Sequence, residues 1–445
     1  MTAKVGVVNL GCAKNLVDTE IMMGLLGQAG FQLVSETDDA DVVLVNTCGF
    51  LVSAQQESAR QILELAQGGT RKIVMAGCMV QRHREEVLEA LPEVSAAIGS
   101  GDLKSIVRVV ERVLDGERFT EIAEKPIYAY DEVLPRLQSG LGPSAYLKIS
   151  EGCDHRCSFC IIPQLRGGHR SRPIETIVEE AKALVAGGTR EVVLIAQDST
   201  RYGLDRYGKA ALPELLEALN AVEGLVWIRL HYAYPMYVND ALFSALRSLP
   251  KVLPYIDIPL QHSHPDVLRR MHRPTNESIE DLVARMRSGV PNLVLRTSMI
   301  VGFPGETDEE FAHLMDFVRA QRLDHVGVFV FSPEEGTTAY PLKGRVPKKV
   351  ANHRRSALMA LQQSVSQSIH DQLVGTELDM LVEAVETKTG ILIGRTYRDA
   401  PDVDGTTFAR CDDPAVEPGD LVRVRITEAK PYDLHGEVTR VLLPA

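Results

Sequence analysis

Three cysteines, Cys153, Cys157 and Cys160, lie within eight residues of one another as a C-x3-C-x2-C motif. Three thiolates at this spacing can bind one face of a [4Fe-4S] cluster and leave the fourth iron without a protein ligand. An iron with an open position can bind a further molecule, so the motif predicts a catalytic cluster. A zinc ion is the alternative to the cluster. A structural zinc site normally takes four ligands from two separated pairs, however, and no second pair accompanies this motif.

A second group of cysteines is spread over the first part of the sequence. Cys12, Cys48 and Cys78 each follow directly after a predicted parallel strand. Ligands of parallel sheets bind outside the carboxyl ends of the strands, so we expect these three thiols to converge. One cysteine after a strand is usually inert, but three in the same phase predict a second cluster site. Cys411 has no such partner and is interpreted as an ordinary thiol.

The elements around the second group predict an N-terminal doubly wound α/β domain. Short apolar strands at 5–10, 41–45 and 72–76 alternate with helical periods at 18–29 and 54–66. Strands separated by helices pair in parallel through right-handed crossovers. We place this domain at residues 1–116, followed by a linker at 117–143 that is rich in proline and glycine.

The C-x3-C-x2-C motif follows the first of six predicted strands, at 145–149, 192–196, 227–230, 255–258, 293–298 and 325–331. Helical segments between them, such as 174–186, 213–221 and 307–320, indicate β/α units. Six units are fewer than a full TIM barrel has, which predicts a central partial (β/α)6 barrel at 144–346 with one open side. An open side would admit a bulky substrate.

The remaining sequence predicts a helix and a small β-domain. Apolar residues recur at helical spacing over 347–374, which indicates one amphipathic connecting helix. From 375 to 445 the sequence changes to short alternating segments separated by Asp, Gly and Pro turns, typical of a small antiparallel β-barrel. The fold class is therefore α/β multidomain with a C-terminal β-module.

The composition limits the cellular environments and the classes of partner that fit this protein. No apolar run approaches the roughly 20 residues that span a bilayer, and the apolar stretch at 5–10 is too short for a signal-peptide core. Seven cysteines are an odd number, which makes a disulfide framework a poor explanation. We expect a cytoplasmic protein with no membrane partner. The net charge of -12 should repel phosphate backbones, so a basic protein partner fits better than RNA.

The motif of Cys153, with Glu151 and Gly152 before it and Ile161, Ile162 and Pro163 after it, resembles the cluster loop of radical S-adenosylmethionine (SAM) enzymes. The resemblance implies that SAM chelates the open iron. It also implies that one electron from the cluster cleaves SAM to a 5′-deoxyadenosyl radical, which abstracts a hydrogen atom. The protein then binds, orients and shields the radical.

In a barrel of this type the SAM pocket is expected at the carboxyl ends of the strands. Polar side chains recur there, although each taken singly could be a structural polar residue. They are Gln197, Asp198, His231, Gln261, Arg296 and Ser298. The turn that contains Gly302 is similar to a family turn at which glycine lets the backbone approach the adenosine part of SAM.

The stretches Asn9 to Asn15 and Asn46 to Gly49 narrow the resemblance to the methylthiotransferases, over essentially the whole chain. That family implies an N-terminal cluster domain, a radical SAM core and a C-terminal TRAM module. It implies two [4Fe-4S] clusters held by the six cysteines other than Cys411. The auxiliary cluster would carry or supply sulfur, and a second SAM the methyl group. An external electron donor and a sulfur donor are implied as well.

Two branches of the family differ in substrate: one modifies an isopentenyl-adenosine in tRNA, the other an aspartyl β-carbon in the twelfth protein of the small ribosomal subunit. Residues 13–15 (Ala-Lys-Asn) and 154–156 (Asp-His-Arg) resemble the ribosomal-protein branch. Residues 375–445 carry 14 acidic and eight basic side chains, a difference of -6 that suits docking on a basic ribosomal protein. A merely solvated surface would look the same.

The best local basic run is 166–172, which we expect to order the active site or to contact a substrate carboxylate; a simple turn before a helix is the alternative. Binding of tRNA is therefore not expected. The alternative functions are a tRNA methylthiotransferase, a non-catalytic iron-sulfur RNA-binding protein and, less well supported, a zinc-stabilised scaffold.

Overall fold

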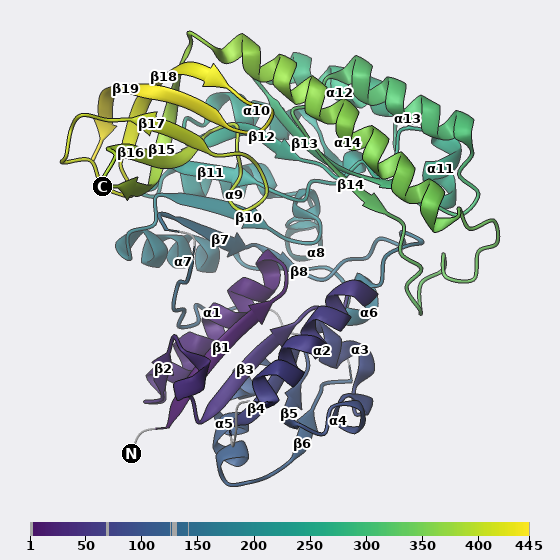
Figure 1. Ribbon diagram of the computed structural model, residues 1–445, viewed down its shortest axis with the longest axis vertical. Helices are drawn as coiled ribbons and strands as arrows, with labels where there is room; N and C mark the ends of the chain where they lie inside the picture. The colour runs from purple at the N-terminus through teal and green to yellow at the C-terminus, as the bar shows by residue number, and fades with distance from the viewer. Residues whose placement is uncertain (1–2, 68–70, 125, 127–130, 141, 445) are drawn as a thin grey trace.

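The computed structural model describes residues 3–67, 71–124, 126, 131–140 and 142–444. Figure 1 shows an N-terminal sheet, a larger central sheet and a C-terminal barrel that follow one another along the chain. Among the described residues, no helix combines the length and the apolar character needed to cross a membrane.

The first sheet contains six parallel strands in the order β2-β1-β3-β4-β5-β6. Its strands are β1 (Lys4–Leu10), β2 (Gln32–Val34), β3 (Val42–Thr47), β4 (Lys72–Gly77), β5 (Val94–Ile98) and β6 (Phe119–Glu121). Its helices are α1 (Ala13–Gln28), α2 (Val52–Ala66), α3 (Cys78–His83), α4 (Glu86–Ala90) and α5 (Ile106–Leu114), with the short 3-10 turns η1 (Thr37–Asp39) and η2 (Leu103–Ser105).

Alternate residues of β3 explain why helices cover both faces of this sheet. Val42 and Leu44 lie in a core with residues of α1 and α5, whereas Val43 and Val45 lie in a second core with residues of α2, α3 and α4. Successive side chains of a strand point to opposite faces, and a strand buried on both faces is apolar throughout. The predicted doubly wound domain is confirmed.

The central sheet is an open, curved layer in the order β14-β13-β12-β11-β10-β7, and all of its neighbouring strands are parallel. Its strands are β7 (Ser144–Lys148), β10 (Glu191–Ile195), β11 (Trp227–Leu230), β12 (Val252–Asp257), β13 (Val294–Val301) and β14 (His325–Val330). These six strands lie within a few residues of the predicted ones, so the partial barrel is confirmed.

Helices and short turns fill the connections of the central sheet. They are α6 (Ile162–Arg166), α7 (Ile174–Ala186), η3 (Ser199–Arg201), α8 (Leu204–Tyr207), α9 (Leu212–Asn220), η4 (Pro235–Tyr237), α10 (Asp240–Ser248), α11 (Pro265–Arg270), α12 (Ile279–Gly289) and α13 (Asp308–Gln321). The strands β8 (Ser150–Glu151) and β9 (Arg170–Ser171) form a separate antiparallel pair that encloses the C-x3-C-x2-C loop.

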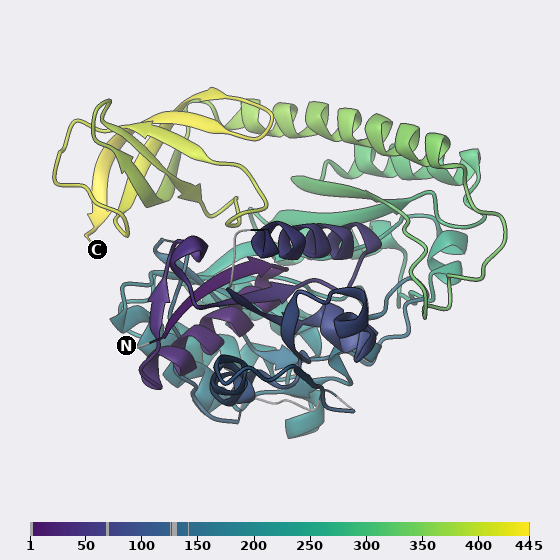
Figure 2. The ribbon, with the colours of Figure 1, turned by 60° about the horizontal axis from the view of Figure 1, so that its bottom comes forward.

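The helix α14 (Lys348–His370) packs on β14 and α13 and leads through the turn η5 (Asp371–Leu373) to the C-terminal barrel (Figure 2). That barrel is closed, in the order β15-β16-β17-β19-β18. Its strands are β15 (Glu377–Glu386), β16 (Ile391–Thr396), β17 (Thr407–Arg410), β18 (Leu421–Ala429) and β19 (Leu434–Leu443). The pairing of β17 with β19 is parallel, which corrects the expectation of an entirely antiparallel barrel.

The first sheet extends further than predicted. β6 lies inside the range 117–143 that the sequence predicts as a linker, because its short segment completes the sheet beside β5. Residues 125, 127–130 and 141 of that predicted linker lie outside the described residues. β2 and β5 have no counterpart among the predicted strands; β2 has only three residues, none of them buried.

The C-terminal barrel contacts the amino-terminal part of the central strands through a buried ion cluster. Glu191, the first residue of β10, accepts hydrogen bonds from Arg229 of β11 at 2.7 Å and from Arg395 of β16 at 2.5 Å. Burial by itself would raise the pKa of Glu191, but the two guanidinium groups outweigh it and lower the pKa to about 2. All three side chains are at most 3% exposed. The carboxylate therefore holds the two domains together.

We expect Glu191→Gln to weaken the contact between the C-terminal barrel and the central sheet. Removing one partner of a buried ion cluster leaves uncompensated charge and costs about 3–5 kcal/mol. Trp227, the chain's single tryptophan, packs with Leu381 and Leu421 of the C-terminal barrel. Urea unfolding followed by tryptophan fluorescence measures this loss. Glu179→Gln, at an exposed pair with Lys182, is the control, and equal unfolding midpoints for both variants would contradict the assignment.

Candidate active site between two cysteine groups

The C-x3-C-x2-C loop is fixed at both of its ends by backbone hydrogen bonds. The Cys153 N–H donates to Gly167 O at 3.0 Å, and the Ser158 N–H donates to Met271 O at 2.9 Å. Gly152 has a φ of +78°, and a Cβ at this position would collide with the backbone of Gly168. Only glycine fits such a close approach at positive φ. The backbone thus presents the three thiols at the carboxyl ends of the central strands.

Of the three cysteines of this loop, Cys153 is buried and Cys157 and Cys160 are half-buried. Burial raises the pKa of Cys153 to about 11 and that of Cys160 to about 12, and the thiolate charge of Cys157 acts in the same direction on both. At neutral pH these two thiols keep their protons until a cation compensates the thiolate charge. Iron does so, because a metal ion deprotonates a coordinating thiol outright. The donor set fits a cluster held by three cysteines.

His155, inside the loop, is held by Asp198, a predicted SAM ligand. His155 Nε2 lies 2.6 Å from Asp198 Oδ2, and its ring stacks on Tyr234 with centroids 3.7 Å apart. The other oxygen of Asp198 accepts the Thr200 N–H, which caps η3. Asp198 therefore positions the cysteine loop, and its predicted contact with SAM stays a prediction.

Two other predicted SAM residues present free polar atoms in the described part of the chain. Gln197 donates from Nε2 to Glu151 Oε1 at 2.7 Å, and its Oε1 is buried without a partner there. His231 Nε2 is likewise buried and unpartnered. Burial lowers the pKa of His231 to about 4, so its ring is neutral at physiological pH. Unsatisfied buried groups call for a ligand or water.

Gln261, which follows β12, lies beside Ser298 in the second half of β13. The Gln261 N–H donates to Ser298 O at 2.8 Å, and the Ile300 N–H donates back to Gln261 O at 2.7 Å. Gln261 has a φ of +73°, a backbone conformation that is rare outside glycine and is often found at functional sites. Both side chains are half-buried and remain candidates for SAM binding.

Arg296 and Gly302 are engaged with other parts of the protein. Arg296 forms ion pairs with Asp257 at 2.9 Å and with Asp404, between β16 and β17, at 3.2 Å. Gly302 has a φ of +76°, and a Cβ there would lie 2.5 Å from Ala351 of α14. Packing of α14 thus explains the glycine, and the expected approach to adenosine stays a prediction.

The second cysteine group converges as the strand phases predict. Cys12 follows β1, Cys48 follows β3 and Cys78 begins α3 after β4, and these three strands are neighbours. The thiols of Cys12 and Cys78 each lie 3.9 Å from Asn15 Oδ1. Burial raises the pKa of Cys48, and the thiolate of Cys12 contributes to that rise. The arrangement fits a second cluster on three cysteines.

Arg166 connects the two cysteine groups. It ends α6, the helix that follows the C-x3-C-x2-C loop, and its Nε donates to Cys78 Sγ at 3.3 Å. The same guanidinium donates to Asp18 and Glu151 at 2.8 and 2.9 Å. Burial raises the pKa of Cys78 to about 11, while the charge of Arg166 acts against that rise. The arginine thus stabilises a thiolate of one group and positions the loop of the other.

Lys148 completes this buried network through Asp18 and through Glu151, whose Oε2 lies 2.9 Å from Nζ. The predicted basic run 166–172 is therefore an ordering element: Arg166 and Arg172 are each 2% exposed. Sequence reasoning did not single out Asp18, Lys148 or Glu151 as site residues. Of these three residues, only Glu151 could have been recognised from the sequence, because it stands in the stretch that resembles the cluster loop.

Lys14 was also missed as a site residue, although it stands two positions after Cys12. Its Nζ lies 3.1 Å from the ring centroid of Tyr232, which follows β11. The side chain thus reaches from the first domain to the carboxyl ends of the central strands. Burial lowers the pKa of Lys14 to about 8, which still leaves it mostly protonated at pH 7.

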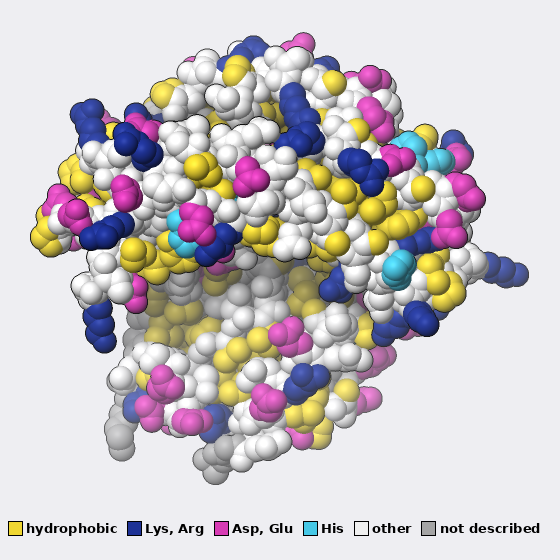
Figure 3. Space-filling model, turned by 45° about the horizontal axis from the view of Figure 1, so that its top comes forward, with side chains coloured by type: hydrophobic (Ala, Val, Ile, Leu, Met, Phe, Trp, Pro, Cys, Tyr) yellow, Lys and Arg dark blue, Asp and Glu magenta, His cyan; other side chains and the backbone are white. Residues whose placement is uncertain are grey.

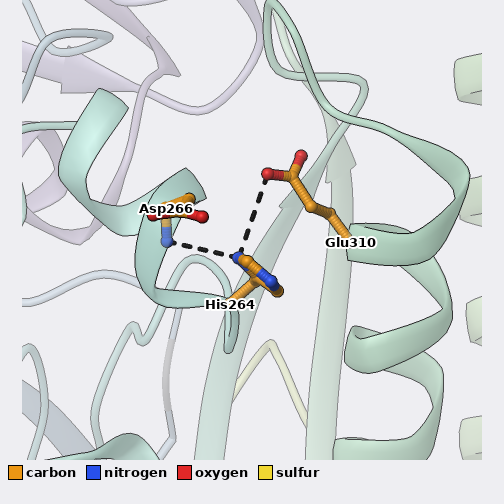
Figure 4. A group of neighbouring side chains, drawn as sticks. All are labelled: His264, Asp266 and Glu310. Carbon is orange, nitrogen blue, oxygen red and sulfur yellow. Dashed lines mark hydrogen bonds and ion pairs between the residues drawn. The ribbon is translucent and has the colours of Figure 1, made fainter.

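His264, Asp266 and Glu310 form a separate group whose geometry also resembles a metal site (Figure 4). His264 Nδ1 accepts the Asp266 N–H at 3.2 Å and so caps α11. Asp266 pairs with Arg269, and Glu310 pairs with Arg270 and completes the capping box of α13. These bonds explain the group as two helix N-termini that meet.

Comparison with known families assigns three parts of the chain. Residues 147–318 match the Radical SAM superfamily, residues 4–99 match the Uncharacterized protein family UPF0004, and residues 374–439 match the TRAM domain. The three matches overlap the central sheet, the N-terminal sheet and the C-terminal barrel, and β14 and β6 lie beyond the matched ranges.

The chain is similar in sequence to curated proteins over nearly its whole length, and in fold to a solved structure. The ribosomal protein uS12 methylthiotransferase RimO of Synechococcus sp. (strain RCC307) is 52% identical over 98% of this chain and 89% of its own length. The protein of the same name from Microcystis aeruginosa (strain NIES-843 / IAM M-2473) is 48% identical over 98% of each chain. The radical S-adenosylmethionine methyltransferase TsrM from Kitasatospora setae has 16% identity and a TM-score of 0.58, over 84% of this chain and 79% of that one. That likeness shows the fold alone.

We expect Arg166→Gln to destabilise the protein and to lower the iron bound by Cys12, Cys48 and Cys78. The variant leaves buried carboxylates short of one positive partner, a loss of about 3–5 kcal/mol, and removes the donor to Cys78. Thermal unfolding of the apo-protein and iron per chain after anaerobic reconstitution measure the two effects. Arg319→Gln, at an exposed pair with Asp316, is the control. Unchanged stability and iron content would refute the bridging role.

Proposed function

The chain belongs to the family of RimO ribosomal protein uS12 methylthiotransferases, and we propose on that premise that it attaches a methylthio group to the β-carbon of an aspartyl residue of uS12. The chain is a radical SAM enzyme and a transferase of a sulfur-containing group. The reaction replaces one hydrogen of the substrate carbon by a methylthio group. The substrate residue and its reacting carbon rest on the resemblance of residues 13–15 and 154–156.

The observation that carries the proposal is the meeting of two cysteine groups at facing strand ends. A radical SAM enzyme uses SAM and a [4Fe-4S] cluster, and Cys153, Cys157 and Cys160 would hold that cluster. Cys12, Cys48 and Cys78 would hold a second one. When bound, these groups would supply the one-electron chemistry and the sulfur. An external electron donor and a sulfur donor complete the proposal.

The chain's own residues have three tasks in this scheme. Asp198 and Tyr234 hold His155 and thereby shape the cysteine loop. Gln197 and neutral His231 offer polar atoms for SAM inside the pocket. Arg166 fixes the distance between the two cysteine groups, because it is bonded to residues on both sides.

The composition of the C-terminal module suggests that uS12 docks there. The structure of this module supports the docking less strongly than the composition does. Of its charged side chains, eight acidic and five basic ones are exposed, so part of the acidic excess is used inside the protein. Asp399 is buried, for example, and Asp404 pairs with Arg296. On the face drawn in Figure 3, acidic and basic side chains are interspersed. The exposed acidic side chains are Glu377, Glu386, Asp402, Asp412, Asp413, Glu417, Glu428 and Glu437.

The substrate is tested by mass spectrometry after anaerobic incubation of reconstituted enzyme with SAM, sulfide and reductant. Recombinant uS12 and an isopentenylated tRNA are offered in separate reactions. We expect a methylthio adduct on an aspartate of uS12 and none on the tRNA, because the exposed excess charge is acidic and the basic run 166–172 is largely buried. An adduct on the tRNA alone would keep the chemistry and reject the substrate.

The division of labour between the cysteine groups is tested by two variants. Cys153→Ala removes a ligand of the proposed catalytic cluster and should abolish reductive cleavage of SAM. Cys48→Ala removes a ligand of the second group only, so SAM should still be cleaved while no methylthio group reaches the substrate. Chromatographic assay of 5′-deoxyadenosine and mass spectrometry of uS12 separate the two outcomes. Methylthiolation by either variant would disprove this division.

A further inference from the structure

We propose that Lys14 binds the carboxylate of the target aspartyl side chain and so holds its β-carbon between the two cysteine groups. This inference rests on the proposed function and adds the residue that would recognise the acidic side chain. It concerns binding and positioning of the substrate, and it assigns no covalent step to Lys14.

The position of Lys14 is the first argument. It lies in the first turn of α1, two residues after Cys12, whereas Tyr232 lies directly after β11 of the central sheet. The Lys14 ammonium lies over the Tyr232 ring, with 3.1 Å between Nζ and the ring centroid. The backbone of Tyr232 has a φ of +60°. Its N–H donates to Asp257 at 3.2 Å, and this bond holds the residue in place. A cation from one domain therefore stands at the active end of the other.

The second argument is that the hydrogen-bonding capacity of Lys14 is unused. The side chain is 8% exposed, and an ammonium group has three donors. The Tyr232 ring provides a cation–π contact, but no acceptor for Lys14 is found among the residues that the structure describes. Arg166, the cation that donates to Cys78, is by contrast bonded to carboxylates.

The neighbouring carboxylates are already engaged. Glu151 accepts from Arg166, Lys148 and Gln197, and Asp257 accepts from Arg296 at 2.9 Å. A mostly buried ammonium without a counter-ion is unfavourable. An incoming carboxylate would form charge-assisted hydrogen bonds there and would replace the lost hydration. The site is thus preorganised for an anionic group.

The third argument selects the substrate over SAM as the source of that anion. Lys14 stands two residues after Cys12 and next to Asn15, whose Oδ1 lies 3.9 Å from the thiols of both Cys12 and Cys78. Lys14 therefore belongs to the sulfur-donating side of the site. Cys12 is the exposed member of its group. In an aspartyl side chain the carboxylate is bonded directly to the β-carbon. A residue that binds the carboxylate therefore also positions the β-carbon.

The test compares the affinity of reconstituted full-length enzyme for labelled uS12 and for uS12 with the target Asp→Asn, by fluorescence anisotropy. Wild-type enzyme should bind the asparagine form at least about tenfold more weakly, the usual effect of losing a hydrogen bond between charged groups. Lys14→Met should bind both forms equally, at the weaker level. Lys14→Arg should restore part of the preference. Lys182→Met, on the exposed surface of α7, is the matched control and should keep the full preference.

Iron content and the absorption spectrum establish that each variant holds its clusters. Equal affinity of wild-type enzyme for the two forms of uS12 would overturn the inference without any variant. The inference would also be overturned if Lys14→Met still bound unmodified uS12 more tightly than the Asp→Asn form. A variant that lost affinity for SAM and kept this difference would overturn it too. If wild-type enzyme neither bound nor methylthiolated uS12, the proposed function itself would fail, and the inference with it.

Discussion

The structure depends on one buried charge network between the first domain and the central sheet. Arg166, Lys148, Asp18 and Glu151 are each at most 6% exposed in their side chains, and their bonds join α1, β7, β8 and α6. Because such groups are costly unless fully paired, the two domains can meet in few other ways. This constraint sets the separation of the two cysteine groups, since Cys78 and Glu151, two residues before Cys153, bind the same guanidinium.

The two ends of the central sheet have different tasks. Its carboxyl ends carry the cysteine loop, the unpartnered atoms of Gln197 and His231, and Tyr232 beneath Lys14. Its amino-terminal part is closed by the C-terminal barrel, through Glu191 and Arg395 and through Asp404. The proposed chemistry and the contact with the C-terminal barrel are thus separated along the strands, as in other parallel α/β architectures, where loops at the carboxyl ends form the site.

Sequence periodicity predicted the strands and helices whose signal lies in neighbouring residues. The six central strands and the three cysteines in phase after β1, β3 and β4 follow from apolar runs and their boundaries. β2 and β6 escaped prediction because each is a three-residue strand on the edge of its sheet. The contacts of Arg166 with Asp18 and of Arg296 with Asp404 could not be predicted, because each joins residues more than 100 positions apart. Lys14 escaped for the same reason: its neighbour Tyr232 lies in another domain.

The bond between Arg395 and Glu191 also bears on how the chain is made. These residues are 204 positions apart, so a ribosome must synthesise the first two domains and β16 before the bond can form. Until then the first two domains can fold on the growing chain, domain by domain. Before Arg395 is made, the Glu191 carboxylate can already bind Arg229 and the Ser144 hydroxyl. A segment made after the central sheet therefore completes the interior of a domain whose strands were made long before it.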